Sequence, residues 1–122
     1  MRIFLQFAII CLSPLLLIGQ DTSKVTIYNA KLFVGKQVTV CDKVVDIFRP
    51  SGENKPIYIN FGAKYPDHVF TAVIFAKDLP SLPYNPIEAF KDKEVCISGT
   101  IAEYKGKPQI VLNGPKQITL KQ

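Results

Sequence analysis

The sequence predicts an all-β domain: a small barrel of five strands in Greek-key order, with one short helix between the third and fourth strands. Five segments carry apolar residues at alternate positions, which is the pattern of half-buried strands. Turns rich in glycine and proline separate most of these segments. A helix-start signature falls between the third and fourth segments. Together these observations give the order strand, strand, strand, helix, strand, strand.

The first strand is predicted over residues 37–48 and contains a change of pattern. Val38 and Val40 alternate with polar neighbours, but the apolar residues of the second half no longer keep that parity. Such a shift is typical of a β-bulge, which lets a strand bend from one sheet into the next. We therefore expect a bent first strand, followed by a loop over residues 49–56 with two prolines and a glycine.

The second and third strands are predicted over residues 57–61 and 69–75. Gly62 ends the second strand, and a turn containing Tyr65-Pro66-Asp67 leads to the third. Both faces of the third strand are apolar. The pattern therefore does not decide which of them faces the core.

The helix signature consists of Asn85, Pro86 and Glu88. Asparagine is a preferred N-cap, proline suits the first helical position, and a carboxylate suits the third. These residues predict a short helix that runs through Phe90. The prolines of the preceding segment, residues 78–85, predict an irregular structure there.

The fourth and fifth strands are predicted to form a β-hairpin over residues 93–112. From Val95 to Ile101, apolar residues and glycine alternate with polar residues and Cys96. The turn at residues 104–107 contains a tyrosine, a glycine and two lysines, and Asn113-Gly114-Pro115 ends the fifth strand. A bent first strand, a helix after the third strand and a closing hairpin are the arrangement of an OB-fold barrel.

Two cysteines, Cys41 and Cys96, lie at the centres of the first and fourth strands, on the face opposite the apolar residues. These strands are neighbours in an OB fold, and facing cysteines on antiparallel neighbours have the spacing of a disulfide. We therefore expect a Cys41–Cys96 bridge. Two free buried thiols are the alternative.

The first residues predict export. Arg2 precedes an apolar run over residues 3–18, and Gly19-Gln20 follow, which is the order of a secretory signal peptide. We expect a signal peptide over residues 1–19, a lead-in with a short helical turn over 20–34, and an OB-fold domain over 35–122. The expected location is secreted or periplasmic. A retained membrane anchor and a lipid-modified Cys11 are the alternatives.

The helical turn is expected to begin at Asn29, to end at Gly35, and to cover one end of the barrel. After removal of the signal peptide the chain has 14 basic and 10 acidic residues, since Arg2 is one of 15. A net charge of about +4 is mild. The simpler explanation is a soluble surface kept away from zero net charge; the excess permits a polyanionic partner without requiring one.

The chain resembles small exported bacterial OB-fold domains, over residues 27–118. The segments that carry the resemblance are VGKQVTVCDKVVD, KPIYINFG, YPDHVFTAVIF, DKEVCISGTIAEYKGKPQIVL and PKQI. It is similar to OB domains joined to some nucleases and to the anticodon-binding domains of class II aminoacyl-tRNA synthetases. This resemblance implies a nucleic-acid-binding role.

OB folds bind ligands on the face of their second and third strands, between the first loop and the last hairpin. Basic and aromatic residues at these places predict a site for single-stranded nucleic acid, in which rings stack on bases and cations meet phosphates. The candidate residues are Arg49, Lys55, Tyr58, Asn60, Phe75, Tyr104, Lys105 and Lys107. The alternative is a protein- or glycan-binding module of the periplasm or cell envelope.

We expect no catalytic site, metal site or cofactor. His68 is the chain's single histidine and lies in a predicted turn. Arg49 is the single arginine after the signal segment, whereas nucleases of the staphylococcal type, which also use an OB barrel, rely on paired arginines. The sequence gives no prediction of oligomeric state.

Overall fold

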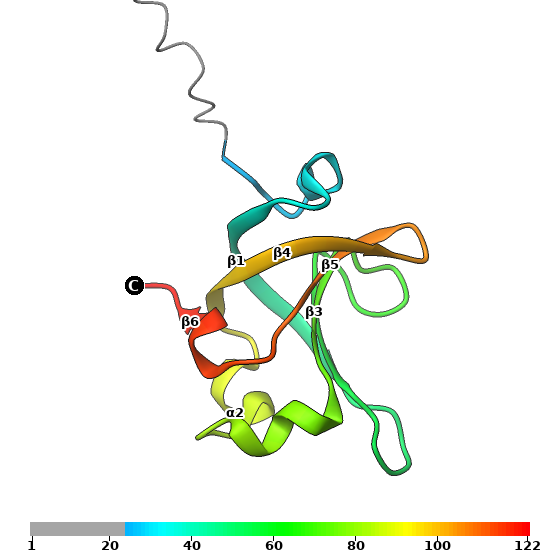
Figure 1. The fold of residues 1–122 in the computed structure, drawn as a ribbon, viewed down its shortest axis with the longest axis vertical. Helices are drawn as coiled ribbons and strands as arrows, with labels where there is room; N and C mark the ends of the chain where they lie inside the picture. The colour runs from blue at the N-terminus through cyan, green and yellow to red at the C-terminus, as the bar shows by residue number, and fades with distance from the viewer. Residues whose placement is uncertain (1–23) are drawn as a thin grey trace, which may run out of the picture.

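In the computed structural model, which describes residues 24–122, five strands close into a barrel (Figure 1). They pair in the order β1–β2–β3–β5–β4, and β4 pairs again with β1. The β3–β5 pairing is parallel and the others are antiparallel. The strands are β1 (Gln37–Phe48), β2 (Ile57–Phe61), β3 (Phe70–Ile74), β4 (Glu94–Tyr104) and β5 (Lys107–Val111). This closed order is that of the OB fold, which confirms the predicted fold class.

Residues 1–23 lie outside the described part of the chain. The predicted signal peptide over residues 1–19, the start of the lead-in and Cys11 all belong to them. Within residues 24–122, no helix has the length and apolar character that crossing a membrane requires.

β1 bends at the predicted bulge. Val44 pairs with Phe61 and Asp46 pairs with Asn60, so Val45 has no partner of its own in β2. The first half of β1 pairs with β4 and the second half pairs with β2. The bulge therefore lets a single strand serve both sides of the barrel.

The predicted disulfide joins the first half of β1 to β4. Cys41 and Cys96 are directly paired in the strand register, with Cα atoms 4.0 Å apart and sulfurs bonded. Two residues along, the Thr39 and Ser98 hydroxyls form a 2.8 Å hydrogen bond. The bridge is consistent with an oxidising compartment, such as the exterior or the periplasm.

The core fills the barrel with side chains of every strand. Its residues are Ile27, Ala30, Val40, Val44, Ile57, Ile59, Phe61, Phe70, Ala72, Ile74, Phe90, Val95, Ile97, Ile101, Ile110, Leu112 and Ile118. On β2 the odd-numbered residues face this core, so Tyr58 and Asn60 face the outside of the barrel. β3 is buried on both faces, since all five of its residues are buried.

The short helix α2 (Pro86–Phe90) lies between β3 and β4, as predicted. The Asn85 side chain accepts hydrogen bonds from the backbone N–H groups of Ile87 and Glu88, at 2.9 and 3.3 Å. This is the expected N-cap. Phe90 then enters the core from the last turn.

Two short 3-10 helices lie where the sequence predicted a helical turn and an irregular segment. The predicted helical turn is the 3-10 helix η1 (Ala30–Phe33), but the Asn29 side chain does not cap it. That amide oxygen instead accepts from the backbone N–H of Thr26, at 2.7 Å. The segment predicted as irregular forms η2 (Ala76–Ser81), which accommodates Pro80.

The C-terminal tail contains a sixth strand that the sequence did not predict. After η3 (Pro115–Gln117), β6 (Ile118–Leu120) pairs antiparallel with β4. The Gln117 side chain holds this tail, since its amide nitrogen donates to the Ser98 and Val111 carbonyls, both at 3.1 Å. β6 extends one edge of the sheet and leaves the barrel itself five-stranded.

Candidate binding pocket

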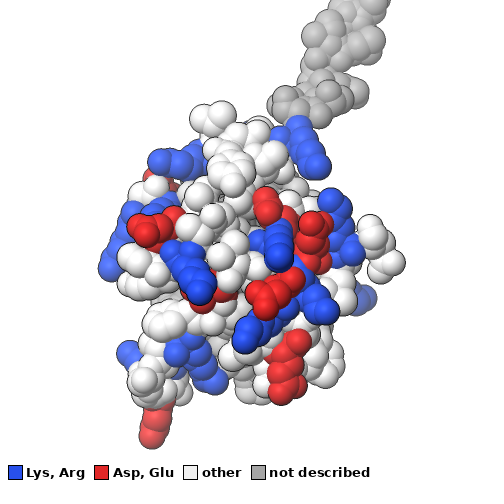
Figure 2. Space-filling view, turned by 180° about the vertical axis from the view of Figure 1, so that it is seen from behind, with Lys and Arg blue, Asp and Glu red and all other residues white. Residues whose placement is uncertain are grey.

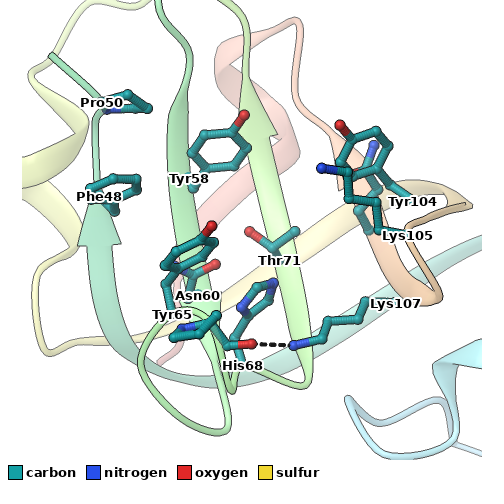
Figure 3. Close-up of a pocket in the computed structure, with 12 residues that line it drawn as sticks. Phe48, Pro50, Tyr58, Asn60, Tyr65, His68, Thr71, Tyr104, Lys105 and Lys107 are labelled. Carbon is teal, nitrogen blue, oxygen red and sulfur yellow. Dashed lines mark hydrogen bonds between the residues drawn. The ribbon is translucent and has the colours of Figure 1, made fainter.

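Three connections reach the same side of the barrel (Figure 1), and residues from each of them line a pocket. They are the β1–β2 loop, the β2–β3 loop and the β4–β5 hairpin. The pocket has a volume of about 330 Å³. It is lined by Phe48, Pro50, Tyr58, Asn60, Tyr65, Pro66, His68, Thr71, Tyr104, Lys105, Lys107 and Gln109 (Figure 3). This is the side of β2 and β3 on which OB folds bind ligands.

The floor of the pocket belongs to a row of polar residues that crosses four strands. Asp46 pairs with Asn60, Asn60 with Thr71, and Thr71 with Gln109. Residues paired across neighbouring strands point to the same face of a sheet. Asn60 and Thr71 are nevertheless 1% and 6% exposed, because the rings and loops around them shield them.

Asp46 fixes the orientation of the Asn60 amide. One carboxylate oxygen of Asp46 accepts from the Asn60 side-chain nitrogen and from the Tyr65 backbone N–H, both at 3.3 Å. Because a carboxylate only accepts hydrogen bonds, the Asn60 amide oxygen must face away from it. That oxygen is buried and has no hydrogen-bond partner among residues 24–122. Buried acceptors without partners are unusual and mark sites that a ligand or water can complete.

One wall of the pocket is a column of four near-parallel rings. The ring centroids of Phe48 and Tyr58 are 6.3 Å apart, with 23° between the planes. Phe48 lies 5.4 Å from Tyr65 at 14°, and Tyr65 lies 5.7 Å from His68 at 16°. Tyr65 is 59% exposed, although its ring stacks on both Phe48 and His68. The bend of β1 places Phe48 at the middle of this column.

The opposite wall is the basic tip of the β4–β5 hairpin. Its turn residues Lys105 and Gly106 both have positive φ, +52° and +81°, as a two-residue type I′ turn requires. The Lys105 ammonium lies 5.4 Å from the Tyr104 ring centroid, a cation–π distance. Lys107 donates a hydrogen bond to the Pro66 carbonyl (Figure 3). This bond ties the hairpin to the β2–β3 loop across the pocket.

The surroundings of His68 favour its neutral form. Its pKa is lowered from the ordinary value of 6.5, first by burial and then by the positive charge of Lys107. Asp46 and Asp67 act in the opposite direction but do not compensate. Its Nδ1 is a second buried polar atom without a partner in the described residues. The pocket therefore holds two uncompensated polar atoms beside the Tyr65 ring.

The structure brings five of the eight predicted site residues together around the pocket. They are Tyr58, Asn60, Tyr104, Lys105 and Lys107. The other three do not line it. Arg49 and Lys55 belong to the β1–β2 loop, where the Arg49 Nε donates to the Lys55 carbonyl at 3.4 Å. Phe75 follows the end of β3 and is the N-cap of η2.

Sequence reasoning did not include the remaining pocket residues among its candidates, above all Phe48, Tyr65 and His68. Phe48 was assigned to the first strand, and its orientation depends on the bulge. Tyr65 and His68 lie in a loop whose path no alternation pattern defines. The aromatic run Phe61, Tyr65, His68 and Phe70 around this turn was a signal that could have pointed to them.

No group of three or more His, Cys, Asp or Glu side chains in residues 24–122 is arranged to hold a metal ion. Cys41 and Cys96 are consumed by the disulfide. On the face seen in Figure 2, basic and acidic side chains are interspersed, so this face carries no patch of a single sign. The pocket offers rings, amides and ammonium groups, which suit binding.

Comparisons with known proteins give no family. No family model matches the chain. No curated protein matches it either.

Two solved structures share a similar chain path with this protein. One is OBody AM2EP06 bound to hen egg-white lysozyme, at 12% identity and a TM-score of 0.49, over 83% of this chain and 93% of that chain. The other is OBody AM1L10 bound to hen egg-white lysozyme, at 15% identity and a TM-score of 0.46, over 75% of this chain and 84% of that chain. Similarity at this level does not indicate a shared ligand. The assignment of the OB fold rests on the strand pairings.

Proposed function

We propose that this chain is a non-catalytic OB-fold binding module whose pocket takes single-stranded nucleic acid. One observation carries the proposal: two walls that bear aromatic rings stand over a floor of buried amide and hydroxyl groups, and ammonium groups lie on one side. Single strands expose flat bases, polar base edges and phosphates, which these three kinds of group complement.

The rings supply stacking. Base–aromatic stacking contributes about 1–3 kcal/mol per base. Tyr104 is 57% exposed and offers a ring for stacking, whereas the Tyr65 ring already stacks on Phe48 and His68. The unpaired amide oxygen of Asn60 is shielded in the free protein, so it accepts from a base edge only if the rings above the floor move aside. Such an edge would satisfy an atom that is left without a partner in the free protein.

The lysines supply contacts to phosphate. Lys105 and Lys107 stand on the hairpin side of the pocket, while Arg49 follows Phe48 on the other side. Few cations contribute, so we expect moderate affinity that falls with added salt. We propose that the protein works outside the cytoplasm, secreted or periplasmic, where its disulfide is stable.

The test is a fluorescence-anisotropy titration with a labelled single-stranded oligonucleotide at low and at physiological salt. A chain that begins at Gln20 is suitable, because the core lies wholly within residues 27–118. The double variant Lys105→Gln with Lys107→Gln should weaken binding. It should also reduce the slope of log affinity against log salt by about 1.4, because each phosphate contact to a single strand contributes about 0.7.

The matched control is Lys91→Gln with Lys93→Gln, which removes the same charge from exposed positions outside the pocket. It should leave the affinity nearly unchanged. Lys105→Gln alone is also needed, because Lys107 holds the β2–β3 loop through Pro66. Absence of oligonucleotide binding at low salt would refute the proposal.

The second candidate function is a protein- or glycan-binding module of the cell envelope. The disulfide favours it, because free nucleic acid is scarce where disulfides persist. Aromatic walls over a polar floor also suit a sugar ring or a peptide. Such contacts should be insensitive to salt, so the same titration with envelope glycans separates the two functions.

A further inference from the structure

A second surface, which shares no residue with the pocket, exposes apolar side chains near the start of the described chain. Tyr28, Leu32 and Val34 are 72%, 82% and 46% exposed. We call these three residues the N-terminal apolar patch. Tyr28 and Leu32 are the two most exposed large apolar side chains within residues 24–122. Single exposed apolar residues are common, but a group this open within seven residues marks an interaction surface.

The backbone holds this patch in place. Ile27, directly before Tyr28, and Ala30, between Tyr28 and Leu32, are buried in the core, at 2% and 0% exposure. The Thr26 hydroxyl accepts from the backbone N–H groups of Tyr28 and Asn29, at 3.1 and 3.2 Å. After Val34, Gly35 donates to the Ile101 carbonyl at 2.8 Å. The three side chains are therefore presented outward by an anchored segment.

The charged residues of the segment that carries the patch are all lysines. Lys24, Lys31 and Lys36 are exposed and form no salt bridge in the described structure. The sequence contains no Asp or Glu between Thr22 and Cys41. In Figure 2 the surface beside the grey segment is mostly white with blue side chains near it, unlike the mixed charges lower on that face.

We propose that the N-terminal apolar patch docks on an anionic lipid surface. Exposed aromatic and aliphatic side chains enter the headgroup region, while nearby lysines reach acidic headgroups. The apolar run at residues 3–18 lies immediately upstream, so export itself brings this end of the chain to a membrane. A second copy is a poorer occupant, since a symmetric contact would bring the same lysines together.

The expected contact is weak and reversible. Each lysine near an acidic membrane contributes about fivefold in affinity, so the three together contribute about 100-fold. The three apolar residues are too few for binding to a neutral membrane on their own. Binding should therefore require anionic lipid and fall with added salt.

The experiment is co-sedimentation of the chain beginning at Gln20 with vesicles. One set contains phosphatidylglycerol and phosphatidylcholine in equal parts, and the other contains phosphatidylcholine alone. Two variants test the surface: Tyr28→Ser with Leu32→Ser, and Lys24→Gln with Lys31→Gln and Lys36→Gln. We expect binding to the anionic vesicles alone, with a loss of at least tenfold in both variants. Thermal unfolding checks that each variant is folded.

Matched control variants remove the same number of apolar side chains or lysine charges from exposed positions outside the N-terminal apolar patch. Phe75→Ser with Leu120→Ser removes two exposed apolar side chains, and Lys91→Gln with Lys93→Gln and Lys116→Gln removes three charges. Neither should change vesicle binding. Failure to bind anionic vesicles would overturn the proposal, and so would equal losses in the controls. Concentration-dependent dimerisation that the Tyr28/Leu32 variant abolishes, without vesicle binding, would assign the patch to a second copy instead.

Discussion

The two halves of β1 have opposite characters. Its first half is paired with β4 from Gln37 to Lys43 and is linked to it by the disulfide and the Thr39–Ser98 hydrogen bond. Its second half follows the bulge, pairs with β2, carries Phe48 to the pocket, and places Asp46 against the Asn60 side chain. Two buried polar atoms beside the second half, Asn60 Oδ1 and His68 Nδ1, have no hydrogen-bond partner in the described residues. The first half is joined to β4 by backbone pairing and by a covalent bond.

This difference shows how a small domain can hold a binding site with incomplete internal bonding. Buried polar atoms without partners cost about 1–3 kcal/mol each, and the pocket contains two. A scaffold of about 100 residues has limited stability from its core alone. The Cys41–Cys96 disulfide in the first half of β1 therefore offsets the stability that is lost at the pocket beside the second half.

The largest expected effect is the loss of the disulfide. Replacing both Cys41 and Cys96 by alanine opens a link with a sequence separation of 55, which stabilises the fold by about 4 kcal/mol in the chain-entropy model. Urea unfolding of the variant and the parent measures this difference. If the free energy of unfolding falls by less than about 1 kcal/mol in the variant, the disulfide does not offset the cost of the unpaired polar atoms at the pocket.

The next effect concerns the glycine that begins the β2–β3 loop. Gly62 has φ +90°, and a Cβ there would lie 2.6 Å from Val69 Cγ2. Gly35 has the same φ but no atom within 4 Å of such a Cβ, so it is a matched control. Gly62→Ala should cost about 1–3 kcal/mol more than Gly35→Ala, because only Gly62→Ala adds an overpacked contact. Equal losses of unfolding free energy in the two variants would show that the Val69 side chain moves aside without cost.

A third effect falls on binding alone. Tyr104→Leu should raise the dissociation constant for a single-stranded oligonucleotide by about 5- to 150-fold, which corresponds to about 1–3 kcal/mol of stacking. Tyr28→Leu is the control, because Tyr28 is more exposed and lies outside the pocket. Stability should be unchanged in both. The same affinity in the two variants would contradict the assignment of Tyr104 to the site.

The smallest expected effect is a pH dependence from His68. Its pKa is lowered in the folded protein, so below the ordinary value of 6.5 the unfolded chain binds a proton more readily. Stability should therefore be highest above pH 6.5 and fall as the pH drops toward the folded pKa. His68→Phe keeps a ring beside Tyr65 but cannot titrate. Thermal unfolding between pH 5 and 8 should show a shallower decline for this variant.

The scaffold could be predicted closely because local signals define it. Alternation placed the first three strands and the ends of the hairpin within one residue of their observed bounds, and the change of parity revealed the bulge in β1. The disulfide followed from two cysteines on the outer face of strands that the fold makes neighbours. β6 was missed because a three-residue strand after a proline turn shows no period.

The site could be predicted only in part. Tyr58 and Asn60 follow from the parity of β2, and Tyr104, Lys105 and Lys107 follow from the hairpin turn. The stacking of Phe48 on Tyr65 depends on a bulge and a loop, which are tertiary features. Phe75 shares the parity of Thr71, but it lies four residues farther along, about 13 Å, beyond the end of β3.

The most direct test of the central claim is an NMR titration of the ¹⁵N-labelled chain beginning at Gln20 with a single-stranded oligonucleotide at low salt. Binding in the pocket predicts amide shifts at Tyr58, Tyr65, His68, Thr71 and Lys105. Residues of α2 and β6 should remain unchanged. Shifts confined to α2, β6 or the N-terminal apolar patch would contradict the account, and so would no shift at saturating oligonucleotide.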